Sequence, residues 1–298
     1  MKILLTGATG FVGHGILERL LEAGHEVRCL LRKNSALPEK WMATGRVELA
    51  HGDILDTATL PKAMAGTDAV IHLVGIIREH RGKGVTFERV HVQGTKNMVN
   101  VAKSVGVPRF VHMSALGARP DAVSMYHKTK WEAEEYVRNS GLNWTVFRPS
   151  VIFGPGDEFV NMLADVLRKT PVFPIFGSGR YSLQPVAREN VAAGFVKALE
   201  LPETIGRAYE VGGPEPIPYR QMLQRIARAI GKKGVVTVPV PVFLVKPVVK
   251  MMEGFPFFPL TTAQLTMLLE GNTCDPLPYS LAFDVALQPF DEGIRDYL

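Results

Sequence analysis

The sequence predicts an α/β protein in which a doubly wound parallel sheet is followed by a smaller, mixed C-terminal domain. Short apolar segments alternate with segments of helical periodicity throughout the first half of the chain. Repeated strand–helix units of this kind form a parallel sheet with helices on both faces. The expected strands are 2–6, 27–31, 47–50, 68–74, 109–114 and 144–147, and the expected helices are 11–22, 57–65, 87–105 and 127–138.

The composition changes near Pro149, after which prolines become frequent in stretches such as PVFPIFG and VPVPVF. We therefore expect one domain over 1–149 and a second region over 150–298. Helices are expected at 158–169, 191–199 and 219–230, and the segment 190–199 is expected to pack back on the first domain.

Charge and cysteine content narrow the function class. The 298 residues include 34 Lys and Arg against 29 Asp and Glu, a net charge of +5, which suits an anionic ligand. No basic run is interleaved with aromatic residues, so we expect no nucleic-acid partner. Cys29 and Cys274 lie outside any metal-ligand spacing, which predicts no metal and a reduced, cytoplasmic protein, although a bridge between them stays open. No apolar stretch reaches the length of a membrane-spanning helix.

A glycine-rich loop connects the first expected strand to the first expected helix. It runs through Gly7, Gly10 and Gly13, with Thr9, Phe11 and Val12 between them. Such glycines permit a tight turn, close backbone approach to a pyrophosphate and close helix packing. The positive end of the helix then faces the phosphates. A glycine turn without a ligand is the alternative, but the flanking strand and helix favour a dinucleotide-binding, Rossmann-type domain.

The residues after the second strand bear on the choice of cofactor. An acidic residue there would bind the ribose of NAD, but this chain has Arg32 and Lys33 and no acid. Arg32 can pair with a 2′-phosphate through two hydrogen bonds. We therefore expect NADP(H), the alternative being an ordinary exposed basic turn.

The ends of the third and fourth strands offer further cofactor contacts. Asp53 is placed to accept from an adenine amino group, with Ile54 against the ring, although a role at the start of the next helix is almost as well supported. Val74 and Gly75 follow the fourth strand, where small residues would let the ribose and pyrophosphate lie close.

Later in the chain, a serine, a tyrosine and a lysine have side chains that suit carbonyl reduction or alcohol oxidation. Tyr126 and Lys130 are four residues apart and share one face of a helix, and Ser114 ends the preceding strand. Tyr126 would exchange a proton with the substrate oxygen, and the Lys130 cation would favour the tyrosinate. Lys130 could also bind the nicotinamide ribose, and Ser114 would hydrogen-bond the reacting oxygen.

These pieces together resemble the atypical or extended short-chain dehydrogenases/reductases. Within them the chain is most similar to the group that includes the NADPH-binding accessory subunit of respiratory complex I and its bacterial relatives. The resemblance covers about residues 1–200. The matching stretches are TGATGFVG (6–13), LLRK (30–33), HGDILD (51–56), VIHLVG (70–75), QGTKNMVNVAKSVGVPRFVHMSALGA (93–118), YHKTKWEAE (126–134), SGLNWTVFRPSVIFGPGD (140–157) and QPV (184–186).

The resemblance implies an oxidoreductase or, in other branches, a sugar-nucleotide epimerase or dehydratase. It adds Pro149 and Val151 to the nicotinamide pocket. It also implies cofactor or catalytic roles for eight of the residues above, namely Gly7, Gly10, Gly13, Arg32, Asp53, Ser114, Tyr126 and Lys130. One departure is His91, which stands where active members commonly have an asparagine that holds the central helix and a relay water. A NADPH-binding structural or assembly role, as in the complex I subunit, is therefore an alternative to turnover.

The second half of the chain is expected to place a substrate over the nicotinamide. It is rich in apolar groups, including the run 255–259 (FPFFP), most of which would form a small core. A proline-rich run of this kind cannot be regular helix interior. If exposed, it would suit an apolar, quinone-like or lipid-like partner, a protein complex or a membrane surface, with Lys246 and Lys250 facing anionic lipid.

Overall fold

The computed structural model describes residues 1–255, 258 and 260–298, and the chain forms two compact units. The first comprises Met1–Pro149, Arg188–Glu210 and Leu277–Val285. The second comprises Ser150–Ala187, Val211–Pro276 and Ala286–Leu298. The apolar run expected at 255–259 falls partly on residues 256, 257 and 259, which lie outside the described residues.

The first unit is built on a seven-stranded sheet of order β11-β6-β5-β4-β1-β2-β3, whose strands from β6 to β3 are parallel to their neighbours. This confirms the predicted doubly wound α/β fold. The strand order reverses between β1 and β4, and in such sheets ligands bind beyond the carboxyl ends of the strands at the reversal. The strands are β1(Lys2–Thr6), β2(Glu26–Leu31), β3(Val47–His51), β4(Ala69–His72), β5(Arg109–Met113), β6(Asn143–Pro149) and β11(Arg207–Val211).

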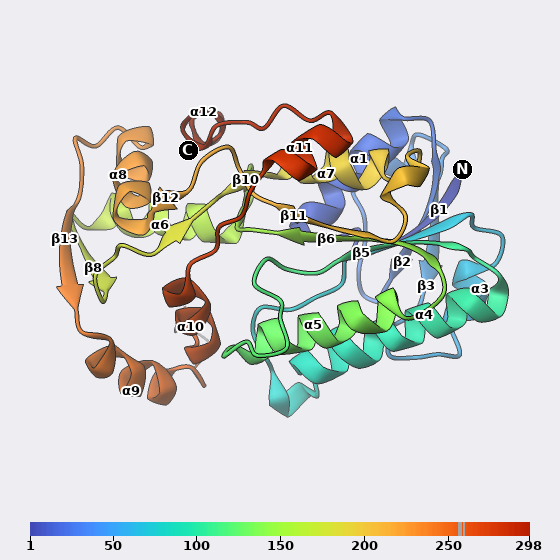
Figure 1. Cartoon of the computed structure of the whole chain (residues 1–298), viewed down its shortest axis with the longest axis horizontal. Helices are drawn as coiled ribbons and strands as arrows, with labels where there is room; N and C mark the ends of the chain where they lie inside the picture. Colours follow the sequence, from blue (N-terminus) through green and yellow to red (C-terminus); the bar gives the residue numbers. More distant parts are fainter. Residues whose placement is uncertain (256–257, 259) are drawn as a thin grey trace. The chain divides into compact units, whose positions relative to one another are not determined.

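Helices cover both faces of this sheet. Figure 1 shows α4 and α5 side by side across one face, near α3, while α1 and α7 pack together on the other. Central strands are buried on both faces, which explains why β1 and β4 read as continuous apolar runs. The helices of this unit are α1(Phe11–Glu22), α2(Glu39–Met42), α3(Leu60–Met64), α4(Gly94–Val105), α5(Met125–Arg138), α7(Arg188–Lys197), α11(Leu277–Phe283) and the short η1(Arg81–Lys83) and η3(Pro202–Thr204).

The prediction of a single helix over 87–105 is wrong in one detail. Its first part is a π-helix, Glu88–Gln93, and α4 begins only at Gly94. A π-helix adds one residue to the turn, which hydrophobic periodicity does not reveal, and such segments are frequent at functional sites. His91 lies within it. Helix α5 also begins at Met125, two residues before the expected start, so Tyr126 lies in its first turn.

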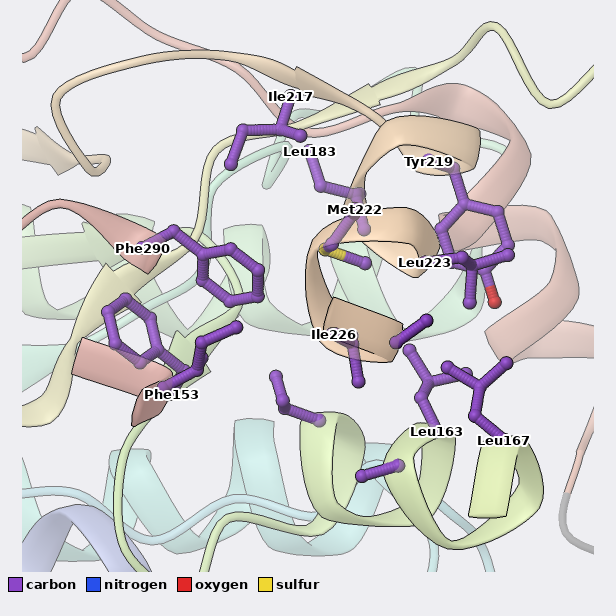
Figure 2. Close-up of a cluster of buried hydrophobic side chains, with 14 of the residues drawn as sticks. Phe153, Leu163, Leu167, Leu183, Ile217, Tyr219, Met222, Leu223, Ile226 and Phe290 are labelled. Carbon is purple, nitrogen blue, oxygen red and sulfur yellow. The ribbon is translucent and has the colours of Figure 1, made fainter. Parts of the chain in front are cut away.

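The second unit has its own apolar core. Figure 2 shows side chains of α8, among them Met222 and Ile226, directed toward α6, which contributes Leu163 and Leu167. Its elements are α6(Glu158–Lys169), α8(Tyr219–Ala229), α9(Val242–Met252), α10(Thr262–Glu270), α12(Phe290–Arg295) and the paired strands β7(Ile152–Phe153) with β10(Val186–Ala187), β8(Val172–Phe176) with β13(Val236–Val240), and β9(Ser182–Leu183) with β12(Ile217–Pro218).

The sequence predicted no helix over 242–252, where the structure has α9 with Pro247 inside it. No helix within the described ranges is long and apolar enough to cross a membrane. Cys29 and Cys274 form no disulfide, and the residues that the structure describes contain no grouping of histidine, cysteine and carboxylate side chains suited to a metal ion.

Candidate functional site

The glycine loop forms a tight cradle between β1 and α1. Gly7 has φ of 78°, in the left-handed region that favours glycine, and its carbonyl accepts from the Gly10 amide at 3.0 Å. A Cβ at Gly13 would overlap the Gly7 carbonyl oxygen and lie 2.9 Å from the Ala8 Cα. Each of these positions therefore requires glycine for close backbone packing, which is the geometry expected of a pyrophosphate loop.

The amino end of α1 leaves its amides available. Gly10 is the N-cap without a side-chain cap, and the first turn contains no acidic residue. Thr9 is exposed in the turn, Val12 is half-buried, and the Phe11 ring lies 5.3 Å from the Arg188 guanidinium. Uncapped first-turn amides and the helix dipole suit an anion. The cradle thus fits the phosphates of a dinucleotide.

Arg32 and Lys33 follow the end of β2 and are both exposed. Within the described part of the chain, neither side chain makes a hydrogen bond or an ion pair. The backbone turns here, because the Arg32 carbonyl accepts from the Ser35 amide at 2.9 Å. Both cations are therefore free to meet a phosphate.

Asp53 and Ile54 are held by local contacts after β3. Asp53 Oδ1 accepts from the Leu55 amide at 2.9 Å, as in a turn that precedes a helix. Ile54 is 6% exposed, and its carbonyl accepts from Asn97 Nδ2 at 2.8 Å. Asp53 thus makes a local contact in the loop before α3, which begins at Leu60, and its second carboxylate oxygen makes no hydrogen bond within the described residues.

Gly75 and Lys130 meet beyond the end of β4. A Cβ at Gly75 would lie 3.0 Å from Lys130 Nζ and 3.6 Å from His91 Nε2, so glycine is what allows this approach. Lys130 is 3% exposed, and its Nζ donates to the Met113 carbonyl at 2.8 Å. Val74, which precedes Gly75, packs at the edge of the apolar core. The structure therefore brings together Val74, Gly75 and Lys130, which the sequence placed in one site.

Burial lowers the pKa of Lys130 to about 8, although the negative charge of Glu134 acts to raise it. Glu134 is itself fully buried and accepts two hydrogen bonds from Arg148. Lys130 is therefore the cation of the site, with a pKa low enough to titrate just above neutral pH.

The protonation state of Tyr126 differs from the sequence-based expectation, which is that the Lys130 cation would favour the tyrosinate. Burial raises the pKa of Tyr126 to about 12, so the phenol stays protonated at neutral pH. The reason is geometric, because Lys130 Nζ is directed to the Met113 carbonyl, and the Tyr126 ring packs edge-on against His91 at 5.4 Å. In the described residues the Tyr126 hydroxyl makes no hydrogen bond. The protonated hydroxyl is therefore available to donate to a ligand.

Ser114 lies directly after β5, next to the carbonyl that holds Lys130. Its amide donates to the Phe147 carbonyl at 2.7 Å, and the residue is 2% exposed. Its Oγ has no hydrogen-bond partner among the described residues. A buried hydroxyl without a partner is unfavourable unless a ligand completes it.

His91 connects three parts of the site. Its Nδ1 lies 2.9 Å from Thr129 Oγ1, and that hydroxyl donates to the Met125 carbonyl at 2.9 Å. With the Thr129 hydroxyl donating to Met125, the imidazole proton lies on Nδ1, and Nε2 accepts from the Ile76 amide at 3.0 Å. In the other tautomer, Nε2 donates to the Ile76 carbonyl, which lies 3.1 Å away. Burial and Lys130 lower the pKa of His91 to about 2, so the ring is neutral. His91 thus ties α5 to the loop that follows β4.

Two further buried histidines were not singled out from the sequence. His72 of β4 and His112 of β5 are register partners whose rings stack at 5.5 Å. His72 lies 2.8 Å from Thr6 Oγ1 and 3.3 Å from Thr95 Oγ1, and burial lowers its pKa to about 3. The sequence could have indicated them, because each histidine lies near the end of an expected strand.

The two remaining expected residues lie in different units. Pro149 ends β6 in the first unit, where its carbonyl accepts from the Leu116 amide at 3.0 Å. Val151 belongs to the second unit and packs against its apolar core.

A family model described as NAD(P)H-binding matches residues 7–202. Among curated relatives, a mitochondrial NADH dehydrogenase [ubiquinone] 1 alpha subcomplex subunit 9 of Dictyostelium discoideum is 28% identical over 78% of this chain and 65% of the relative. A 3-beta-hydroxysteroid dehydrogenase of Mycolicibacterium neoaurum is 31% identical over 78% of this chain and 71% of the relative.

Among solved structures, the Thermus thermophilus UDP-glucose 4-epimerase complex with NAD has a TM-score of 0.75 and 23% identity, covering 99% of this chain and 96% of that one. This likeness concerns the fold. The chain spans just under two thirds of the Dictyostelium relative's own length.

Proposed function

This chain belongs to the NAD(P)H-binding, atypical short-chain dehydrogenase/reductase family, and on that premise we propose that it is an NADP(H)-dependent reductase of apolar carbonyl compounds. The observation that carries the proposal is the group at the strand ends. A buried lysine, a protonated tyrosine in the same helix and a buried serine hydroxyl without a partner lie at the end of β5 and the start of α5.

Each residue has a distinct role in this proposal. The glycine cradle and Arg32 would hold the dinucleotide, and the nicotinamide supplies the hydride when the cofactor is bound. Tyr126 would give its proton to the substrate oxygen, while the Ser114 hydroxyl would donate a hydrogen bond to that oxygen. Lys130 would provide positive charge beside the cofactor ribose. Because burial raises the pKa of Tyr126 to about 12, the phenol is protonated at neutral pH, which is the state that a proton donor to a carbonyl oxygen needs.

The proposed substrate class draws on the relatives. The dehydrogenase of Mycolicibacterium neoaurum is named for a hydroxysteroid, an apolar molecule with one reacting oxygen. The second unit, with its own apolar core, would be the substrate region, as the sequence predicts for 150–298.

A second candidate is a NADPH-binding structural subunit without turnover. His91 favours it, because an imidazole bonded to Thr129 and the Ile76 amide has no ring nitrogen left to hold a relay water. The Dictyostelium relative, named as a respiratory complex subunit, points the same way.

The test is NADPH oxidation with a panel of aldehydes, ketosteroids and quinones, by the wild type and by Tyr126→Phe. We expect kcat to fall about 10²–10⁴-fold in the variant, because the general acid is lost. The dissociation constant for NADPH should be unchanged. Tight NADPH binding with no oxidation of any substrate would support the structural role, and no NADPH binding would overturn both.

A further inference from the structure

Helix α9 carries an unusual number of exposed large apolar side chains for a surface helix. The exposed fractions are 73% for Phe243, 54% for Leu244, 50% for Val248 and 70% for Met251. A surface helix normally exposes polar residues opposite its buried stripe, whereas this one is apolar on both sides. Its outer face therefore exposes the apolar surface that marks an interaction site.

The opposite side of α9 is buried and packs within its own unit. Val245 and Val249, one turn apart, are 9% and 2% exposed and pack against Leu265 of α10. This seam fixes the helix on its own unit. The exposed apolar side chains contribute nothing to it, so the core of the unit does not account for them.

The positions around the helix axis separate three faces. At about 100° per residue, the exposed apolar side chains fall within an arc of roughly 140° that begins at Phe243. The buried seam follows at about 200–240°, and Lys246 and Lys250 fall at about 300–340°, bordering Phe243. Both lysines are exposed, and α9 has no acidic residue. The acid that follows, Glu253, accepts from the Thr262 amide at 2.7 Å.

We propose that this face of α9 docks on the surface of an anionic lipid bilayer. The helix would lie in the interface plane, with its apolar arc at the boundary of headgroups and acyl chains and with Lys246 and Lys250 on lipid phosphates. Charge complementarity favours an anionic lipid surface, because two exposed lysines border the apolar arc and α9 has no acidic residue that would repel the headgroups. Lysines in this position can extend toward headgroups.

The test is co-sedimentation of the full chain at low ionic strength with mixed phosphatidylcholine and phosphatidylglycerol vesicles, and with pure phosphatidylcholine vesicles. We expect the wild type to prefer the anionic vesicles. Phe243→Ser with Met251→Ser should weaken binding at least tenfold, since two apolar side chains no longer enter the membrane. Lys246→Gln with Lys250→Gln should weaken binding to anionic vesicles about 25-fold, at about fivefold for each lysine.

The matched control is Leu277→Ser with Leu281→Ser on α11, which removes apolar side chains that are 60% and 77% exposed elsewhere. It should bind vesicles as the wild type does. The NADPH dissociation constant should be unchanged in all variants, which separates this test from that of the proposed function. Equal binding to both vesicle types, or unchanged binding by either α9 variant, would overturn the proposal. A dimer that the Phe243 and Met251 substitutions dissociate would overturn it too, in favour of self-association.

Discussion

Replacing Arg32 with alanine should convert a cofactor preference into indifference. Arg32 is exposed at the end of β2 and makes no ion pair or hydrogen bond among the described residues, so the substitution breaks nothing inside the fold. Any change in affinity will therefore report contact with the ligand. Because the guanidinium can make two hydrogen bonds to a 2′-phosphate, NADPH should lose affinity while NADH should not.

The magnitude follows from the exposure of the side chain. A hydrogen bond between charged groups contributes about 1.5–3 kcal/mol, and solvent screening at an exposed site favours the low end of that range. If the exposed two-bond contact as a whole contributes about 1.5 kcal/mol, its loss corresponds to roughly a tenfold rise in the NADPH dissociation constant. Arg32→Lys should lose less, since it keeps the charge but not the planar fork. The loss should also shrink at high salt.

Isothermal titration with NADPH and NADH would measure these constants. Lys103→Ala is the control, because Lys103 is also an exposed cation. It lies in the last turn of α4, shortly before the amino end of β5, whereas Arg32 follows the carboxyl end of β2. The reasoning fails if Arg32→Ala weakens both cofactors equally, or neither, or if Lys103→Ala reproduces its effect.

Three further outcomes test the rest of the site. Gly13→Ala should weaken NADPH binding at least tenfold and lower the free energy of unfolding by about 1–3 kcal/mol, because its Cβ would overlap the Gly7 carbonyl. Gly82→Ala is the control, because a Cβ there meets open space, and it should change neither quantity. Titration with NADPH and thermal unfolding would measure the two effects. NADPH affinity should fall as pH rises through about 8, since Lys130 is charged below its pKa and neutral above it, and Lys130→Met should bind more weakly without that pH dependence. His91→Ala should cost about 1–3 kcal/mol, because it removes the hydrogen bonds that the buried imidazole makes with Thr129 and with the backbone of Ile76. His91→Asn should recover part of that stability in denaturant unfolding; equal losses in the two variants would contradict the assigned hydrogen bonds.

The parts of this protein that could be read from sequence are those governed by local rules. The glycine loop is local, because a strand, a turn and a helix within thirteen residues specify it. The Tyr126 and Lys130 pair follows from helical spacing. The parallel sheet follows from alternating apolar and amphipathic segments, and its strand order, which the sequence did not specify, is that of a dinucleotide-binding sheet.

Helix α9 shows where local rules fail. Proline in a helix interior removes a hydrogen bond and clashes with the preceding turn, and the sequence predicts no helix over 242–252, which contains Pro247. In the structure Pro241 is the N-cap, where its fixed φ is compatible, and only Pro247 lies inside. Packing of Val245 and Val249 against Leu265 stabilises the helix despite Pro247. Such a tertiary contact is absent from the local sequence pattern.

The electrostatics of the site depend on register, which is also non-local. His72 and His112 are forty residues apart but share a row of the sheet because β4 and β5 pair in parallel. Burial and the charge of Lys130 lower the pKa of both rings and of His91, so all three are neutral at pH 7. Protonating any of them would place a second positive charge near Lys130, in surroundings that stabilise charge poorly. The same burial keeps Tyr126 protonated. Lys130 is therefore a positive charge beside three neutral imidazoles and a protonated phenol, while the carboxylate that raises its pKa, Glu134, is paired with Arg148. This arrangement attracts electron-rich oxygen atoms of a ligand.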